Sequence, residues 1–475
     1  MASRGLILAA PASGSGKTLV TAGLLRHLHR RGVRVGAAKA GPDFIDPTFH
    51  AAASRMPCVN LDAWAMRPNT LARLVGGLEA SAEIVLCEGV MGLFDGTGAD
   101  GEAGSTAELA LITGWPVVLV VDARGQGASI AALLRGFAHH RPALPLAGVI
   151  FNRVASERHR VLLGGAVARH LPDLAILGAL PADAALALPS RHLGLVPAEE
   201  VGATEVVIER AAELIRTSLD IDRLLRLARP SRLASEIVGG EIIAGVPPLG
   251  RNVAVARDDA FRFLYPALVE GWRRQGAEVS FFSPLADQPP NPAVDAVYLP
   301  GGYPELWAGR LAAAAAFIAG LRRAAAENKP VYGECGGYMV LGEALIDAAG
   351  RRHTMAGLLP LVTSFAQRRL SLGYRSAALL AQGPLGPAGS GFRAHEFHYA
   401  TVTHEGAADR LWSMTDAAGT DLGICGLRRG SVFGSFIHLI DAAAPAIEYG
   451  ALAGLHLAPD LALPEDVIDD FEHPG

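Results

Sequence analysis

The chain has 475 residues, half of them hydrophobic and 19% charged, with a formal net charge of −5 at pH 7. A chain of this length exceeds one ordinary hydrophobic core, so we expect two or three domains of a well-buried α/β protein. The charge balance gives no reason to expect nucleic acid or an anionic membrane as a partner. Anionic ligands must then be held by local basic groups and backbone N–H groups.

The start of the chain, residues 1–12, weakly resembles a secretory signal, but its apolar run continues directly into a glycine-rich loop, which favours a strand. No apolar stretch reaches membrane-spanning length. Four cysteines show neither C-x-x-C pairing nor zinc-site spacing: Cys58, Cys87, Cys335 and Cys425. We therefore expect a protein of the reducing cytoplasm.

The first half of the sequence alternates short apolar runs with amphipathic stretches. The patterns predict helices at Leu19–Arg30 and Ser129–His139, and strands at Leu6–Ala10, Val33–Ala38, Ile84–Cys87, Val117–Val121 and Gly148–Phe151. Runs that are apolar on both faces and joined by helices indicate a parallel sheet covered on both sides.

A stretch rich in proline and glycine around residues 226–251 interrupts this alternation and is interpreted as a linker. We expect one domain over residues 1–228, the linker at 229–250, a second α/β domain at 251–463 and an acidic tail at 464–475. Strands of the second domain are predicted at Val253–Ala256, Glu278–Phe282, Val294–Leu299 and Pro330–Tyr332, with a β-rich segment from about His395 to Phe436.

A glycine-rich loop follows the first predicted strand, with the sequence Ser13-Gly14-Ser15-Gly16-Lys17-Thr18. Backbone N–H groups on such a strand-to-helix turn favour phosphate oxygens. Lys17 is expected to reach the outer phosphates of a nucleotide and the Thr18 hydroxyl to bind Mg²⁺. The strict pattern fails at one position, because Pro11 stands where the first glycine is usual.

Two acidic segments come directly after predicted strands. One runs from Lys39 through Asp43 to Asp46, and the other from Glu88 to Asp95. Ligands bind beyond the carboxyl ends of strands in doubly wound sheets, and acidic residues there can hold Mg²⁺. Asp43 and Asp95 could equally be helix caps or solvated loop charges, whereas the strand-end position of Glu88 favours a functional role.

A cysteine lies between glycines near the other end of the sequence, in Gly333-Glu334-Cys335-Gly336-Gly337. On a sharp strand-to-helix turn, we expect Cys335 to be an exposed nucleophile whose pKa is lowered by the helix N-terminus. Backbone N–H groups of Gly336 and of the turn containing Gly301 and Gly302 could stabilise an oxyanion.

His438 follows a late predicted strand and is the favoured base for Cys335. His395 and His398 are the main competitors. A buried cysteine in a glycine-rich turn is the alternative without catalysis.

With these motifs assembled, the chain resembles the cobyrinic acid a,c-diamide synthase family, including its hydrogenobyrinic acid-specific members. The resemblance covers nearly the whole chain and rests on the loop at 10–18, the segments 41–47 and 88–96, Arg191-His192-Leu193-Gly194-Leu195-Val196, the Pro-Gly-Gly-Tyr-Pro-Glu turn at 300–305 and the Cys335 segment. It implies a P-loop domain like dethiobiotin synthetase, followed by a class I glutamine amidotransferase domain.

The resemblance also implies an activity and a set of roles. The activity is ATP- and glutamine-dependent amidation of the a- and c-acetate carboxylates of (hydrogeno)cobyrinic acid through acyl phosphates. The implied roles are as follows: Cys335 and His438 in the glutaminase site; Lys17, Thr18, Asp46 and Glu88 as phosphate and Mg²⁺ ligands; Asp43 and Asp95 in amidation; Lys39 in the ATP site; Asn152 at the nucleotide base; and Arg191 and His192 at substrate carboxylates. The partners would be ATP, glutamine and a tetrapyrrole polycarboxylate.

Related amidotransferases often place a glutamate two residues after the histidine, but that position is Ile440 here. The acid that would orient His438 is therefore undefined, and Asp441 is not assigned that role.

Alternative substrates are nickel sirohydrochlorin and the substrate of cobyric acid synthase. The motifs of the cobyric acid synthase family fit this sequence less well. A non-catalytic ATPase switch is disfavoured, because Ala12 stands where such proteins place a second lysine. The oligomeric state stays open, with a homodimer as one option.

Overall fold

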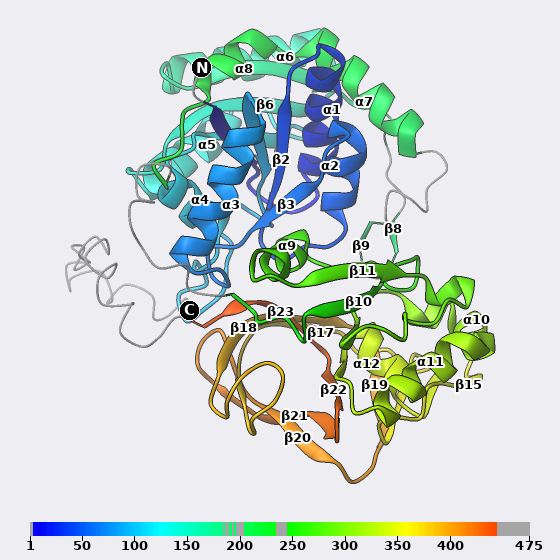
Figure 1. The fold of residues 1–475 in the computed structure, drawn as a ribbon. Coiled ribbons are helices and arrows are strands. Elements are labelled where there is room, and N and C mark those ends of the chain that lie inside the picture. The colour runs from blue at the N-terminus through cyan, green and yellow to red at the C-terminus, as the bar shows by residue number, and fades with distance from the viewer. Residues whose placement is uncertain are drawn as a thin grey trace, which may run out of the picture.

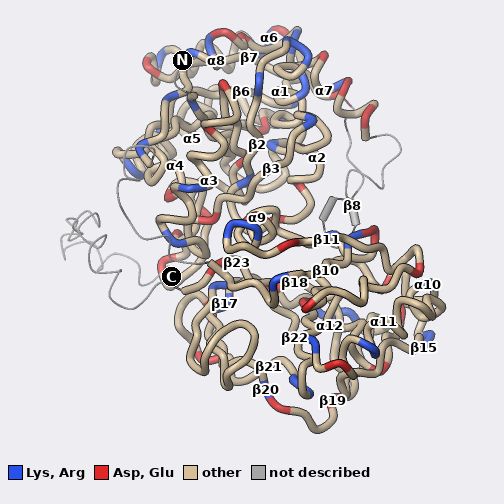
Figure 2. The backbone as a smooth tube through the Cα atoms, in the orientation of Figure 1, with Lys and Arg blue, Asp and Glu red and all other residues tan. Residues whose placement is uncertain are grey.

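The computed structural model describes residues 3–183, 186, 190–191, 194–195, 204–233 and 245–443. Two α/β halves lie one above the other, and each is built around its own large sheet (Figure 1). Acidic and basic residues are interspersed over both halves and do not form one large patch of a single charge (Figure 2). Within the described ranges, no helix combines the length and apolarity needed to cross a bilayer.

The first sheet is entirely parallel and has seven strands in the order β3-β2-β4-β1-β5-β6-β7. Its strands are β1 (Arg4–Ala9), β2 (Val35–Ala40), β3 (Cys58–Leu61), β4 (Ile84–Glu88), β5 (Val117–Asp122), β6 (Leu146–Val154) and β7 (Ala175–Pro181). The helices among them are α1 (Lys17–Arg30), α2 (Asp46–Ser54), α3 (Pro68–Ser81), α4 (Thr106–Thr113), α5 (Ile130–His140), α6 (Glu157–His170), α7 (Thr204–Ser218) and α8 (Ile221–Leu227).

Alternate residues of these strands enter two separate cores. Leu6 and Leu8 of β1 pack with α1, α7 and α8, whereas Ile7 and Ala9 pack with α3 to α6 on the other face. A strand that is apolar at every position therefore requires helices on both faces, as the sequence predicted.

The second large sheet has ten strands in the order β11-β10-β12-β13-β22-β21-β20-β17-β18-β23. The parallel part comprises β10 (Asn252–Ala256), β11 (Glu278–Phe282), β12 (Ala296–Leu299), β13 (Val331–Glu334) and β22 (Val432–Ser435). The antiparallel part comprises β17 (Ser371–Leu379), β18 (Gly391–His398), β20 (Asp409–Asp416), β21 (Asp421–Arg429) and β23 (Ile437–Ala442).

Shorter elements complete the second half. A four-stranded sheet contains β14 (Ala344–Ile346), β15 (Arg352–Thr354), β16 (Leu361–Ser364) and β19 (Thr401–Glu405), and the helices are α9 (Pro266–Arg274), α10 (Ala308–Ala313), α11 (Ala315–Ala326) and α12 (Gly336–Leu341). The strands β8 (Ser190–Arg191) and β9 (Gly194–Leu195) form a small hairpin.

The predicted fold class is confirmed, with shifts at particular elements. Strand β2 begins at Val35 rather than Val33, because the N–H of Val33 still donates to the carbonyl of Leu28 at the end of α1. The β-rich part begins before His395, at β14 and β17; the half-exposed strand β17 lacked a continuous apolar run. The predicted domain boundaries stay predictions, and residues 234–244 and the acidic tail lie outside the described residues.

The two halves are joined by a buried ionic contact and by shared apolar packing. Arg67, just before α3, donates through Nη2 to Asp441 Oδ1 of β23 at 2.9 Å, and its backbone N–H donates to Asp441 Oδ2 at 3.0 Å. Thr70 Oγ1 donates to Asp441 Oδ2 at 2.7 Å. One hydrophobic cluster also runs from the α3–α6 face of the first sheet into α9 and β10 of the second half, where Figure 1 shows α9 between the two sheets.

Replacing Asp441 with alanine should destabilise this junction. The substitution removes the carboxylate to which a buried guanidinium donates, and breaking such a pair costs about 3–5 kcal/mol. We expect a lower free energy of unfolding in urea, and Glu213→Gln, which breaks an exposed pair with Arg216, should leave it unchanged. Equal stabilities for the two variants would contradict a supporting role for the ionic contact.

Candidate functional site

The glycine-rich loop lies between β1, the central strand of the first sheet, and α1. Gly16 has a φ of 94°, and a Cβ on it would lie 2.3 Å from Nδ2 of Asn152. Asn152, near the end of β6, donates from Nδ2 to the carbonyl oxygen of Ser15 at 2.9 Å. The structure therefore places the predicted base-side residue Asn152 directly against the loop, in a position that only glycine at 16 permits.

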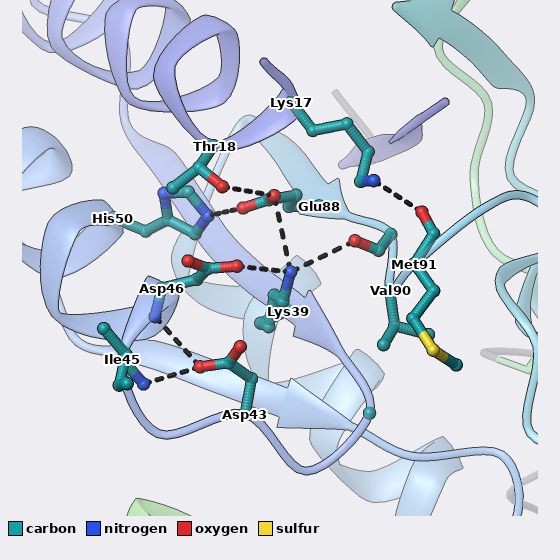
Figure 3. Close-up of polar contacts among 12 residues, drawn as sticks. Lys17, Thr18, Lys39, Asp43, Ile45, Asp46, His50, Glu88, Val90 and Met91 are labelled. Atoms are coloured by element: carbon teal, nitrogen blue, oxygen red, sulfur yellow. Dashed lines mark hydrogen bonds and ion pairs between the residues drawn. The ribbon is translucent and has the colours of Figure 1, made fainter. Parts of the chain in front are cut away.

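The predicted polar residues at the carboxyl ends of β2 and β4 meet beside this loop (Figure 3). Lys39 and Glu88 are partners in the β2–β4 register, so their side chains arise at the same level of the sheet. Lys39 Nζ lies 2.7 Å from Asp46 Oδ2 and 3.4 Å from Glu88 Oε1. Thr18 Oγ1 donates to Glu88 Oε1 at 2.8 Å. Residues from four different elements, α1, β2, α2 and β4, thus form one cluster.

His50 belongs to this cluster and was missed from the sequence. Its Nε2 lies 2.5 Å from Glu88 Oε2, and the whole residue is buried on α2. A lone histidine on a helix gives no sequence signal, since it becomes meaningful only when α2 packs against the end of β4.

Burial and neighbouring charges act against each other in the cluster. Burial alone would raise the pKa of Glu88, but the charges of Lys39 and His50 lower it to about 2. Burial and the nearby Asp43 raise the pKa of Asp46 to about 7. Burial alone would lower the pKa of Lys39, but Asp46 and Glu88 raise it above its ordinary value. The site therefore keeps a cation between its two carboxylates.

The remaining predicted residues of this half hydrogen-bond to backbone groups. Lys17 Nζ donates to the carbonyl oxygen of Met91, and burial lowers the pKa of Lys17. Asp43 Oδ1 accepts from the N–H groups of Ile45 and Asp46 at 2.6 and 3.0 Å, at the start of α2. Asp95 Oδ2 accepts from the N–H of Gly92 at 2.8 Å. Asp43 and Asp95 thus do act as backbone caps, and a further role for either residue is a proposal.

Cys335 is placed on the predicted turn, but its environment differs from the prediction. The residue has a φ of 47° between β13 and α12, a strained conformation for a side chain other than glycine. However, it is only 2% exposed, and burial, with a smaller contribution from Glu305, raises the pKa of its thiol. The expectation of an exposed, low-pKa thiol was wrong, because the side chain packs inside the hydrophobic cluster of the second half, where desolvation outweighs the backbone N–H of Gly336 at the start of α12.

His438, on β23, lies beside Cys335. A Cβ on Gly301 would be 2.3 Å from Cε1 of His438 and 3.1 Å from Cβ of Cys335. Both side chains therefore meet at Gly301, and only a residue without a side chain allows this approach. The backbone nitrogen of Gly302 lies 3.1 Å from where a Cβ on Gly336 would be, so the predicted oxyanion donors are also adjacent.

The competing histidines have other environments. His398 Nε2 lies 2.9 Å from Glu396 Oε1, and the His398 ring stacks on Phe436 at 4.0 Å. His395 lies opposite His438 in the β18–β23 register, and burial lowers the pKa of both histidines to about 3. The closeness of His438 to Cys335 favours His438 as the base.

One loop joins the two clusters. Phe44 directly follows Asp43, and its ring lies 4.9 Å from that of His438, centroid to centroid. The same ring stacks on Phe263 at 4.9 Å and on Tyr265 at 4.3 Å, while Tyr265 Oη donates to the carbonyl of Pro42 at 2.9 Å. The segment 41–46 therefore contributes an acidic residue to one cluster and an aromatic cover to the other.

The predicted substrate residues cannot be placed in the same way. His192 lies outside the described residues, and only the backbone of Arg191 is described, in β8. Their assignment stays a prediction.

Two known family models match the two halves of the chain. The family described as the CobQ/CobB/MinD/ParA nucleotide binding domain matches residues 6–196, and the CobB/CobQ-like glutamine amidotransferase domain matches residues 252–445. A protein of Brucella anthropi named hydrogenobyrinate a,c-diamide synthase is 54% identical over 443 residues, which are 92% of this chain and 98% of the relative. The chain belongs to the hydrogenobyrinate a,c-diamide synthase family.

Other members of this family show the same extent of similarity. A Sinorhizobium protein of the same name is 51% identical over 93% of this chain and 100% of its own length. A Rhodobacter capsulatus protein is 54% identical, with 92% of this chain and 98% of the relative covered. The chain is therefore an ATP-dependent, glutamine-hydrolysing amide ligase of the family that acts in cobalamin biosynthesis. The prediction of an enzyme rather than an ATPase switch is confirmed.

Two glycines of the phosphate loop offer a matched pair of substitutions. Both have positive φ, 78° at Gly14 and 94° at Gly16, but a Cβ on Gly14 would meet nothing within 4 Å. Gly16→Ala should weaken ATP binding at least tenfold, because the new methyl group collides with Asn152. Gly14→Ala should cost only the backbone strain of about 1 kcal/mol. Calorimetric titration with ATP measures both, and equal losses would contradict the close approach at Gly16.

Proposed function

We propose that this enzyme uses ATP and glutamine to amidate the a- and c-acetate side chains of hydrogenobyrinate. The names of the relatives supply the substrate, and the two adjoining clusters supply a chemical route. The proposal rests on the position of the segment 41–46, which contacts both clusters. Because this segment lies between the clusters, ammonia released at one would have a short path to the other.

Activation of the carboxylate is assigned to the first half. A carboxylate is a poor electrophile, so transfer of the γ-phosphoryl group of ATP to one of its oxygens makes an acyl phosphate that ammonia can attack. Lys17 and the N–H groups of the loop would stabilise the charge that spreads over the phosphoryl oxygens. Asp43 and Asp95, at the edge of the same site, would face the reacting acetate group.

A magnesium ion fits the oxygen donors of this half. Among the described residues, no group of three or more His, Cys, Asp and Glu side chains forms a metal site. However, Mg²⁺ at nucleotide sites is commonly held by one or two carboxylates, substrate phosphates and water. Thr18, Asp46 and Glu88 would provide its protein ligands, and Lys39 already shows that a positive charge is stabilised between the two carboxylates. Bound Mg²⁺ would neutralise phosphate charge.

Release of ammonia is assigned to Cys335 and His438. The thiol proton would pass to the imidazole as the sulfur attacks the side-chain amide of glutamine, and the imidazole would return it to the leaving ammonia. The resulting thioester is hydrolysed by water. The adjacent N–H groups of Gly302 and Gly336 would stabilise the oxyanion of the tetrahedral intermediate.

The four cysteines of the described chain are free thiols. This finding supports our proposal that the enzyme works in the reducing cytoplasm.

The two half-reactions should separate on substitution of the thiol. Cys335→Ala should abolish glutamine-dependent amidation by removing the nucleophile, yet retain amidation with added ammonium salt. Lys17→Ala should lose both activities, because ammonia cannot attack a carboxylate that has not been activated. Amide product measured by mass spectrometry tests both variants. Persistent glutamine-dependent synthesis by Cys335→Ala would refute the assignment of the glutaminase site.

A further inference from the structure

The imidazole of His438 lacks the hydrogen bond that usually fixes a catalytic base. Within the part of the chain that the structure describes, neither Nδ1 nor Nε2 of His438 has a hydrogen-bond partner, although the residue is completely buried. Buried polar atoms are almost always paired, so an unpaired one needs an explanation. Nε2 lies on the side of Cys335, since Nε2 and Cβ of Cys335 are each 3.1 Å from where a Cβ on Gly301 would be. It would take the thiol proton in catalysis, although Sγ here donates to the carbonyl of Phe397 at 3.6 Å. The other nitrogen requires a second group, which cannot come from Ile440, the position two residues after the histidine.

Glu334 is the carboxylate placed to fill this role. Its Oε2 lies 3.9 Å from Nδ1 of His438, and the residue is 2% exposed. Two neighbours hold the carboxylate: the N–H of Leu439 donates to Oε1 at 3.1 Å, and Tyr298 Oη donates to Oε2 at 2.6 Å. Because Leu439 directly follows His438, the hydrogen bond to its N–H ties Glu334 to the strand that carries the base.

Three other acids near the site have different neighbours. Asp441 accepts hydrogen bonds from Arg67 and Thr70 at the junction of the two halves. Glu396 lies against Arg375 and His398. Glu305 acts on the thiol of Cys335, whose pKa it raises.

We propose that Glu334 is the positioning residue for His438, and that its carboxylate accepts the Nδ1–H hydrogen bond when glutamine is bound. This inference rests on the proposed roles of Cys335 and His438. Acceptance at Nδ1 leaves Nε2 as the basic nitrogen that faces the thiol. The thiol proton moves to Nε2 while Glu334 stays ionised and stabilises the imidazolium. The side chain needs to move by less than about 1 Å to reach hydrogen-bonding distance.

The charges around His438 make such a carboxylate necessary. Burial lowers the pKa of His438, and His395 and His398 lower it further, whereas Glu396 raises it. An imidazolium in this setting needs a nearby negative charge. Burial raises the pKa of Glu334 itself to about 7, with Tyr298, Tyr332 and the N–H of Leu439 acting in the opposite direction. Ionised Glu334 therefore predominates only above about pH 7, and glutamine hydrolysis should rise through that pH.

Glu334→Gln tests the inference, because glutamine has the same shape and its carbonyl oxygen can still accept from Leu439. We expect kcat for glutamine hydrolysis to fall about 10²–10⁴-fold with little change in KM. Ammonia-dependent amidation should be retained, and the rise of the hydrolysis rate near pH 7 should disappear. Glu327→Gln, an exposed change in the same half, is the control and should match the unsubstituted enzyme.

Alkylation of Cys335 by iodoacetamide gives a second readout that needs no turnover. In Glu334→Gln the alkylation rate should rise only at higher pH than in the unsubstituted enzyme. A hydrolysis rate within threefold of normal, an unchanged pH profile, or equal loss of the glutamine- and ammonia-dependent activities would overturn the inference. Failure of the proposed function is distinct, since it would appear as glutamine-dependent synthesis by Cys335→Ala.

Discussion

The packing of Phe44 against His438 is the contact on which the rest of the account depends. It places the loop between β2 and α2 over the base of the other half, and the residue before Phe44 belongs to the phosphate-side cluster. Two further contacts hold the halves together. One is the buried ion pair of Arg67 with Asp441, and the other is the stacking of Phe263 and Tyr265 on Phe44. Ammonia loses its reactivity when it is protonated in water, so a dry contact between the two sites is what the coupled reaction needs.

Burial of both Cys335 and His438 explains why their electrostatics differ from those of an exposed pair. Burial raises the pKa of the Cys335 thiol and lowers that of His438, so the neutral pair is favoured while the site is closed. Catalysis then depends on groups that favour charge separation once glutamine is bound. The oxyanion donors and Glu334 are the candidates. On the phosphate side, the ammonium group of Lys39 lies between the carboxylates of Asp46 and Glu88 and stabilises their negative charge.

The sequence predicted the features that depend on local pattern. The parallel first sheet, the loop at Lys17 and the turn at Cys335 follow from apolar runs next to glycines, and the structure has them all. The convergence of Lys39 with Glu88 could also be anticipated, since both lie at carboxyl ends of neighbouring parallel strands. Contacts between distant segments could not be predicted. His50, Phe44 and Glu334 acquire their partners only through packing, and Cys335 is buried by the hydrophobic cluster that the second half folds around it.

Isotope competition tests the central claim, that ammonia passes between the sites without entering solvent. The enzyme would be supplied with glutamine labelled with ¹⁵N in its side-chain amide and with unlabelled ammonium salt in solution. We predict that the product amides keep the glutamine label, and that Phe44→Ala dilutes it while Phe137→Ala, at a stacked pair away from the junction, does not. Dilution in the unsubstituted enzyme to the ratio of the mixed pools would contradict a closed passage.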